Sequence, residues 1–315
     1  MDNSLIKIDG DSKALSTLID AISRGIGTLY RPWGIKREAK AKAAEIQILA
    51  EAKVKEQQIF SEAKKQLDIV ASDEQLHRTI SRIVNQELRR QENIDAIAKI
   101  ALAELDESRL LAVKEQVETD WLTRYFDIVQ DVSDERLRNA WGKILSQEIM
   151  SPGSYSLRTL NTVSNLSKKE AELFASLGNL VLSTGSVLFF INKKNSILGS
   201  DISFNNISLL MECGLIREEH ALHIIIEPKE KPAKSAWIYQ DKALLLDFKT
   251  DSCRVPIYEL TSAGRELYKI LTVSFQLDYL KQIVAYFKNI QLGYSKLISF
   301  NDDQIEYDDD VVKLY

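Results

Sequence analysis

Apolar side chains near the N-terminus recur every three or four residues, from Leu15 to Trp33. This spacing places them on one face of a helix and the intervening polar residues on the other. The sequence therefore predicts an amphipathic segment over residues 1–34. Its apolar face comprises Leu15, Leu18, Ile19, Ile22, Ile26, Leu29, Tyr30 and Trp33.

Residues 35–180 are predicted to form long helices and a helical bundle. Between Ile35 and Trp141 there is neither glycine nor proline, which excludes a β-sandwich or barrel in this stretch. Residues 35–70 are rich in strong helix formers and predict either a solvated bundle helix or an oligomerising coiled-coil stalk. A capping-box pattern at Ser72 predicts a further helix that runs to Asp106.

Capping residues mark the helices that follow. Starts are predicted at Thr119 or Asp120, at Ser133, at Ser154 or Ser156, and at Ser167. The sequence S-K-K-E at Ser167 is a second capping-box pattern. The dipeptide at 152–153 is expected to end the helix that begins near Ser133.

The hydrophobic period shortens after about residue 185. Short strands are predicted at 187–191, 223–226, 237–240, 243–248 and 255–260, with helices at 201–216 and 260–271. The stretch from there to Tyr294 is predicted to be helical. Residues 302–310 hold six acids, so residues 295–315 are expected to be a mobile acidic tail. The fold class is thus mainly α: an elongated helical N-terminal part, and a C-terminal α+β domain over 181–294.

Composition narrows the function and the location. The net charge of −5 gives no general electrostatic case for nucleic-acid binding. Two cysteines, Cys213 and Cys253, form no disulfide framework and favour the reducing cytoplasm. The N-terminus lacks the apolar core of a signal peptide, and the longest apolar stretch, 177–191, is too short and polar to span a membrane.

The end of the N-terminal segment combines aromatic and basic residues. Interfacial membrane helices use this combination, with the apolar face among lipid headgroups and the cations beside anionic lipid. Two interpretations stay open: the helix packs on its own bundle or a neighbouring subunit, or it contacts a membrane surface, peripherally at the inner membrane. The candidate membrane- or partner-binding residues are Leu18, Ile22, Ile26, Tyr30, Arg31, Trp33, Lys36 and Arg37.

The sequence predicts no catalytic residue, metal site or cofactor. It has three histidines, and His220 and His223 lack further ligands at zinc spacing. Nucleophile-elbow, phosphate-loop and zinc-protease motifs are missing. A non-enzymatic protein is therefore expected.

Residues 201–271 resemble a winged-helix layout. A helix that ends in LLMECGLI leads to a hairpin, and YELTSAGREL then leads into another helix. The resemblance implies a winged-helix-like fold for the C-terminal domain. Residues 176–272 hold 11 basic and 11 acidic residues, whereas a DNA reader needs a positive surface. A protein-interaction or dimerisation role is therefore preferred to DNA binding.

The central block resembles an uncharacterised bacterial family, one of the numbered domains of unknown function. The motifs are DWLTRYF, WGKILSQEI and PGSYSLRTL, which begin at Asp120, Trp141 and Pro152. We expect these residues to be structural, with an ion pair from Glu148 to Arg158 fixing a corner between two helices. The matching positions include Asp120, Trp121, Arg124, Phe126, Trp141, Gly142, Leu145, Glu148, Pro152, Gly153, Ser156, Arg158 and Thr159.

The same region is more distantly similar to the abortive-infection alpha family of helical phage-defence proteins. The hypothesis is therefore an anti-phage defence protein that acts through membrane-surface or protein-partner contact and through self-association as a homo-oligomer. The alternative is a winged-helix regulator that binds nucleic acid.

Overall fold

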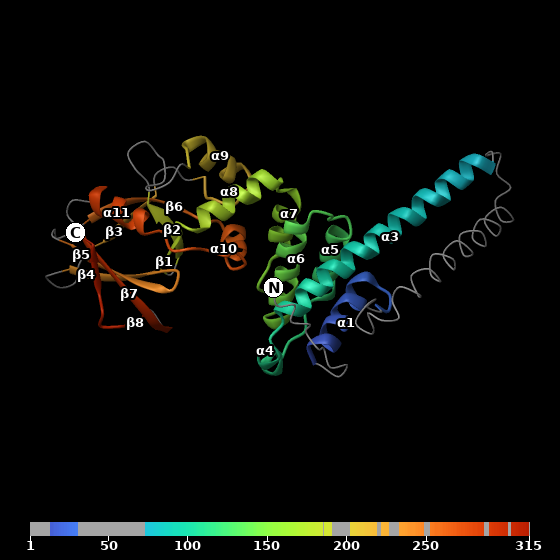
Figure 1. Ribbon diagram of the computed structural model, residues 1–315, viewed down its shortest axis with the longest axis horizontal. Helices are drawn as coiled ribbons and strands as arrows, with labels where there is room; N and C mark the ends of the chain where they lie inside the picture. Colours follow the sequence, from blue (N-terminus) through green and yellow to red (C-terminus); the bar gives the residue numbers. More distant parts are fainter. Residues whose placement is uncertain are drawn as a thin grey trace, which may run out of the picture. The chain divides into compact units, whose positions relative to one another are not determined.

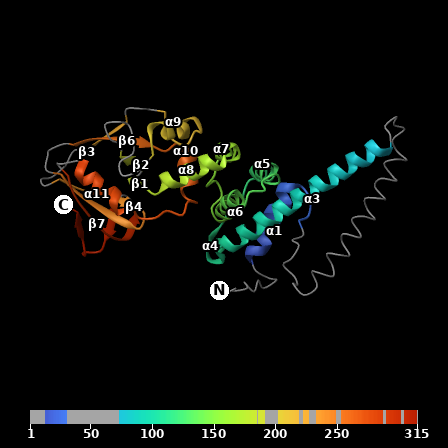
Figure 2. The same ribbon diagram turned by 45° about the horizontal axis from the view of Figure 1, so that its top comes forward.

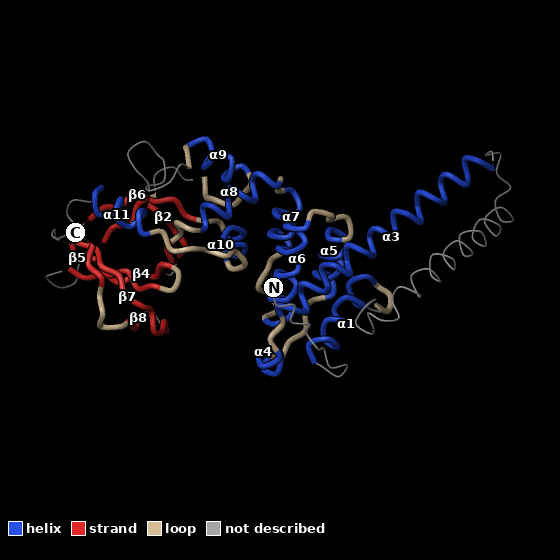
Figure 3. Tube along the Cα trace, in the orientation of Figure 1, coloured by secondary structure: helices blue, strands red, loops and turns tan. Residues whose placement is uncertain are grey.

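The computed structural model describes residues 13–30, 73–184, 186–190, 202–218, 222–226, 233–248, 253–286, 290–301 and 304–314. The chain divides into two compact units, Met1–Ser154 and Tyr155–Tyr315. We call them the helical unit and the sheet unit. Figure 3 shows that the described part of the helical unit contains helices, whereas the strands belong to the sheet unit. The prediction of a mainly α chain with a C-terminal α+β part is therefore confirmed.

The helical unit is built on two helix pairs. The long helix α3 packs against α6, and α1 packs on α5. Figures 1 and 2 show these four helices gathered in the helical unit. The core between them contains Ile97, Leu122 and Ile144, each with no exposed surface. The helices are α1 (Lys13–Ile26), α3 (Asp73–Glu104), α4 (Glu107–Ala112), α5 (Thr119–Val129) and α6 (Glu135–Met150).

The predicted helices are present, and several begin one residue away from the expected cap. Asp134, rather than Ser133, caps α6 through its side chain, which accepts bonds from two backbone N–H groups. Helix α5 begins after Glu118, which makes no side-chain capping bond. The predicted helix over 35–70 and the cap at Ser72 lie outside the described residues.

The helices of the sheet unit agree with their capping signals. Ser156 caps the helix after the Pro-Gly turn, and Ser167 with Glu170 forms the complete predicted capping box. Gly214, at a φ of +72°, follows α9, as a helix that stops in the left-handed conformation requires. The helices are α7 (Leu157–Asn165), α8 (Lys168–Gly178), α9 (Phe204–Glu212), α10 (Ser262–Tyr268) and α11 (Leu277–Tyr286).

The strands pair antiparallel in the order β3-β6-β2-β1-β4-β5-β7-β8, and β9 also pairs with β7. One face of β5 and β7 is buried at Leu244, Leu246 and Leu292, on the side where α11 contacts the sheet. The strands are β1 (Leu182–Thr184), β2 (Ser186–Phe190), β3 (His223–Ile226), β4 (Ala233–Tyr239), β5 (Lys242–Phe248), β6 (Cys253–Glu259), β7 (Ile290–Asn301), β8 (Gln304–Tyr307) and β9 (Val312–Leu314).

The C-terminal stretch corrects two predictions. Residues 290–294 belong to a strand instead of a helix, and the expected acidic tail over 295–315 contains most of β7 together with β8 and β9. Alternating apolar and polar residues from Ile290 to Phe300 satisfy the strand period. The hydroxyl of Ser295, 2% exposed, donates to the backbone carbonyls of Asp308 and Asp310 at 2.6 and 3.1 Å. Acidic side chains thus accompany an ordered backbone that pairs with β7.

The boundary between the units also differs from the expected one. The predicted change near residue 180 coincides with the start of the sheet at Leu182, whereas the compact units divide after Ser154. Helices α7 and α8 therefore belong to the sheet unit. The reason is that α7 packs on α10, a helix that begins more than a hundred residues further along the chain.

The junction between α9 and α10 is closed by the threonine and glycine of the L-T-x-x-G string. The Thr261 hydroxyl donates to the Gly214 carbonyl at 2.6 Å and accepts the Gly264 N–H at 3.0 Å. A Cβ on Gly264 would lie 2.2 Å from the backbone oxygen of Leu215. Only glycine therefore allows α10 to approach the end of α9 this closely.

Candidate functional site

The N-terminal helix uses its apolar face inside the helical unit. Leu18 and Ile22 are 2% and 0% exposed where α1 packs on α5, and Ile26 is half-buried. Leu18 and Ile22 therefore pack on the helix's own bundle, and their side chains are not available to a lipid surface. Of the other candidate membrane- or partner-binding residues, Arg31, Trp33, Lys36 and Arg37 lie outside the described residues.

Tyr30 anchors the chain that follows α1. Its hydroxyl donates to the Asp95 carboxylate on α3 at 2.8 Å, and its side chain is 5% exposed. Burial, followed by the hydrogen bond to Asp95, raises the pKa of Tyr30 far above its ordinary value. Tyr30 therefore stays a neutral hydrogen-bond donor that ties the two helices together.

Aromatic residues from the family motifs form the centre of the helical unit. Trp121 stacks on Tyr125 with centroids 5.1 Å apart, and Trp141 meets Tyr125 edge-on at 5.5 Å. The buried Tyr125 hydroxyl donates to the Trp141 carbonyl at 2.7 Å. The two remaining motif residues of α5, Asp120 and Arg124, are exposed. The tryptophans are packing residues, as the sequence predicted.

The turn after α6 is held by a buried carboxylate. Glu148 is 2% exposed, and its Oε1 accepts the backbone N–H of Gly153 at 2.6 Å. Gly153 directly follows Pro152 and has a φ of +82°. The expected partner, Arg158, belongs to the other unit, where it is exposed. Glu148 thus stabilises a local turn, and its ion pair with Arg158 stays a prediction.

The second half of the PGSYSLRTL string binds α7 to α10. Glu266 accepts the backbone N–H of Ser156 at 2.8 Å and the hydroxyl of Thr159 at 2.5 Å. The Ser156 hydroxyl caps α7 by accepting the Thr159 N–H. A carboxylate at the N-terminus of α7 also suits the helix dipole. These contacts give the string a structural role at both ends.

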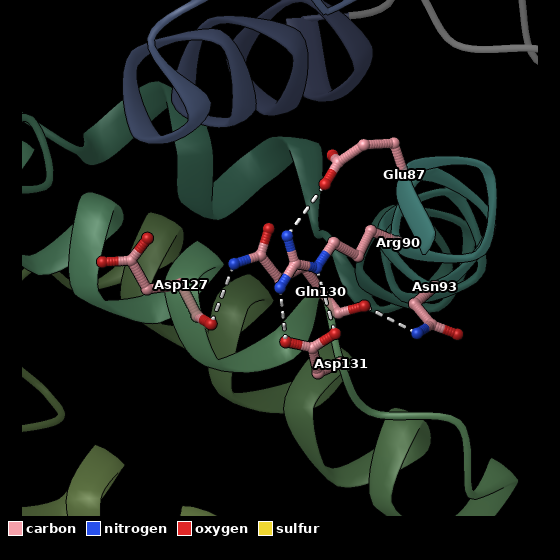
Figure 4. Close-up of polar contacts among 6 residues, drawn as sticks. All are labelled: Glu87, Arg90, Asn93, Asp127, Gln130 and Asp131. Carbon is pink, nitrogen blue, oxygen red and sulfur yellow. Dashed lines mark hydrogen bonds and ion pairs between the residues drawn. The ribbon is translucent and has the colours of Figure 1, made fainter. Parts of the chain in front are cut away.

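A polar cluster that the sequence did not predict joins α3 to the end of α5 (Figure 4). Arg90 on α3 binds Asp131 through two parallel contacts of 3.1 and 3.2 Å, and Glu87 at 2.8 Å. The hydrogen bonds to Asp131 and then Glu87 raise the pKa of Arg90. Asn93, with no exposed surface, donates to the Gln130 carbonyl at 2.6 Å. These residues come together only when α3 packs on the end of α5, so no local sequence pattern predicts the cluster.

Arg138 on α6 completes the same cluster. Its guanidinium donates to the side-chain oxygen of Asn93 and to the Val132 carbonyl at 3.0 Å. Asn93 therefore links three helices through one buried amide. In the described part of the chain every buried side-chain nitrogen or oxygen has a hydrogen-bond partner. A cluster with its hydrogen bonds already satisfied is typical of a structural network.

An open hollow of about 730 Å³ in the helical unit borders the Pro-Gly turn. Arg109, Lys114 and Glu115 contribute charges of both signs, and Met150 and Pro152 contribute apolar surface. Among the described residues no three His, Cys, Asp or Glu side chains are grouped as a metal ion would require. No helix in the same residues is both long and apolar enough to cross a membrane.

Comparison with known proteins places the chain in a family. No curated protein and no solved structure matches it. A family model described as "Protein of unknown function (DUF2806)" matches residues 77–284, which is more than half of the 315 residues. The match includes the DWLTRYF, WGKILSQEI and PGSYSLRTL strings and the helix after YELTSAGREL. The chain therefore belongs to the DUF2806 family.

Proposed function

We propose that this protein is a non-enzymatic binding protein that self-associates through the first half of α3. The supporting observation is an apolar face on this helix whose edges are open: Ile83 and Leu88 are each 52% exposed. Large apolar side chains on one face of a long helix are typical of helix-to-helix association.

The apolar face continues beyond the part of α3 that packs in the bundle. Residues three, four or eight positions apart share a helix face. Ile80 is three positions from Ile83, four from Val84 and eight from Leu88, so Ile80 groups these apolar residues into one face. In the second half of α3 the equivalent residues Ile97 and Ala101 are fully buried. In the first half Ile80 is buried, and the exposed edges at Ile83 and Leu88 offer apolar surface to a second copy of the helix.

Mass in solution tests this proposal. We expect the 35.8-kDa chain to form a dimer or larger assembly, and Ile83→Asp with Leu88→Asp to return it to the monomer mass in light scattering. Arg82→Ala with Arg89→Ala is the matched control, because it shifts the net charge by the same two units at exposed positions on the opposite side of the helix. A monomeric wild-type chain, or an unchanged mass in the double variant, would contradict the proposal.

We further propose anti-phage defence as the cellular role, on the basis of the resemblance to the abortive-infection alpha family. Phage plaque counts on bacteria that express the wild-type chain or the Ile83→Asp, Leu88→Asp variant test it. Protection that is lost in the variant supports defence through self-association. Because the apolar face of α1 is buried, peripheral membrane attachment would use the remaining candidates Arg31, Trp33, Lys36 and Arg37. Liposome flotation tests it, and no lipid binding by the wild type would remove it.

A winged-helix regulator is the second candidate, and the strand order favours it. Strands β3, β6 and β2 are neighbours, with α9 between β2 and β3 in the chain and α10 directly after β6. This succession is similar to the helix, wing and following helix of the winged-helix layout. Retardation of duplex DNA that weakens as salt rises would support it. Absence of retardation at low salt would remove it.

A further inference from the structure

The end of β7 and the short strand β8 form a two-stranded ribbon that projects past β5. Strand β5 pairs with β7 only as far as Lys296, and β8 then pairs with β7 from Leu297 onward. Three of the ten large apolar side chains that are exposed among the described residues belong to this short ribbon. They are Ile298 at 64%, Phe300 at 44% and Tyr307 at 37%.

The register places Phe300 and Tyr307 together with two further apolar residues, while Ile298 lies in the irregularity between Leu297 and Ser299. Phe300 lies opposite Ile305, and Tyr307 lies opposite Leu297, so all four share one face of the ribbon. Ser299 occupies the other face, where its hydroxyl donates to Glu306 at 2.7 Å. The ribbon therefore has an apolar face and a polar face.

A hollow continues from the apolar face along the sheet. Its volume is about 450 Å³, and Tyr307 lines it together with Leu245, Gly293, Val311 and Leu314. Gly293 keeps the floor open, since a Cβ there would lie 2.9 Å from a methyl group of Val311. Asp247, Gln291 and Lys313 also line the hollow, so it offers polar groups beside the apolar side chains that an apolar anchor residue would contact.

The charge around this surface is acidic. Residues 296–313 contain six acids and two lysines, which is a net charge of −4. Glu306, Asp308, Asp309 and Asp310 are exposed. A second copy of this chain docked here would bring two such acidic clusters together, which costs binding energy. The charge therefore favours a basic partner.

We propose that the β7–β8 ribbon and the adjoining hollow bind an extended, basic segment of a partner protein. Apolar side chains at alternate positions of the segment contact Phe300, Ile298 and Tyr307 and enter the hollow. Lysine or arginine side chains at the intervening positions lie beside the acidic residues. An extended segment fits because its side chains alternate with the same two-residue period as the ribbon.

Three fluorescein-labelled peptides test this on the full-length chain by fluorescence anisotropy. The probe is Lys-Val-Lys-Phe-Lys-Val-Lys, and the two comparison peptides replace either the apolar residues by serine or the lysines by glutamate. We expect saturable binding of the probe and binding at least about tenfold weaker for each comparison peptide. Equal binding of the serine peptide would overturn the proposal, because attraction by charge alone would then explain the result.

Surface variants locate the binding on the protein. Phe300→Ser and, separately, Ile298→Ser are expected to weaken probe binding about tenfold with an unchanged circular dichroism spectrum. Leu111→Ser is the matched control, since it removes an apolar side chain that is 73% exposed in the helical unit. Unchanged binding in both ribbon variants would overturn the proposal. So would a smaller assembly mass in Phe300→Ser, which would identify the ribbon as a contact between copies.

Discussion

Substitution of Gly25 by alanine distinguishes packing of α1 on the bundle from exposure to a membrane or partner. Gly25 lies in the last turn of α1 against α5, and a Cβ there would lie 2.2 and 2.8 Å from two ring carbons of Phe126. On an unpacked helix the same change is stabilising, because alanine is a better helix former than glycine by about 1 kcal/mol. Gly25→Ala is therefore expected to destabilise the protein if α1 packs on α5, and to stabilise it if α1 is unpacked.

The magnitude follows from the crowding at Phe126. Carbon atoms are in ordinary contact at about 3.5 Å, so the ring must retreat by about 1 Å. Phe126 is 3% exposed and lies edge-on to Tyr125 at 5.0 Å, which leaves it little room. Overpacking of this kind costs about 1–3 kcal/mol. After the gain in helix propensity we expect a net loss of up to about 2 kcal/mol, or a fall in Tm of up to about 8 °C.

Urea denaturation followed by circular dichroism at 222 nm measures the change. A double-mutant cycle with Phe126→Leu supplies the control: Gly25→Ala should cost less once the ring is smaller. A rise in stability on Gly25→Ala, or equal costs in both backgrounds, would refute the packing of α1 on α5.

Three further substitutions or reagents test the sheet unit. Gly264→Ala should lower stability by about 3 kcal/mol in urea denaturation, because the Leu215 oxygen 2.2 Å away is backbone and has little freedom to move; an unchanged midpoint would contradict this. Hydrogen bonds from the backbone and side chain of Ser167 lower the pKa of Glu170, so its stabilisation is complete above its unfolded pKa and is lost as pH falls through the folded pKa. The stability difference between wild type and Glu170→Gln should therefore shrink as pH falls below the ordinary pKa of 4.5, and a difference that does not change with pH would exclude this origin. Burial, then the charge of Glu170, raises the pKa of Cys213 to about 11, so iodoacetamide at pH 8 should label it slowly by peptide mass spectrometry, and faster in Glu170→Gln.

Local patterns predicted the elements that depend on neighbouring residues. The helix of α3, the capping box at Ser167 and the strand over 223–226 follow from spacing and capping within a few positions of the chain. The amphipathic pattern of α1 was equally readable, and so was its need for a partner surface. The sequence did not predict that α1 packs on α5, because α5 lies about a hundred residues away in the chain.

The tertiary structure decided which residues meet. Glu148 accepts a bond from the backbone of Gly153 within its own turn, and Arg90 reaches Asp131 across 41 positions of the chain. The acids near the C-terminus predicted a mobile tail, yet β7 provides backbone partners that order them. Sequence period fixes the face that a side chain occupies, whereas its partner depends on the packing of distant elements. For this protein, local sequence patterns therefore determined the fold class. The polar clusters and the exposed ribbon form only when distant elements pack together.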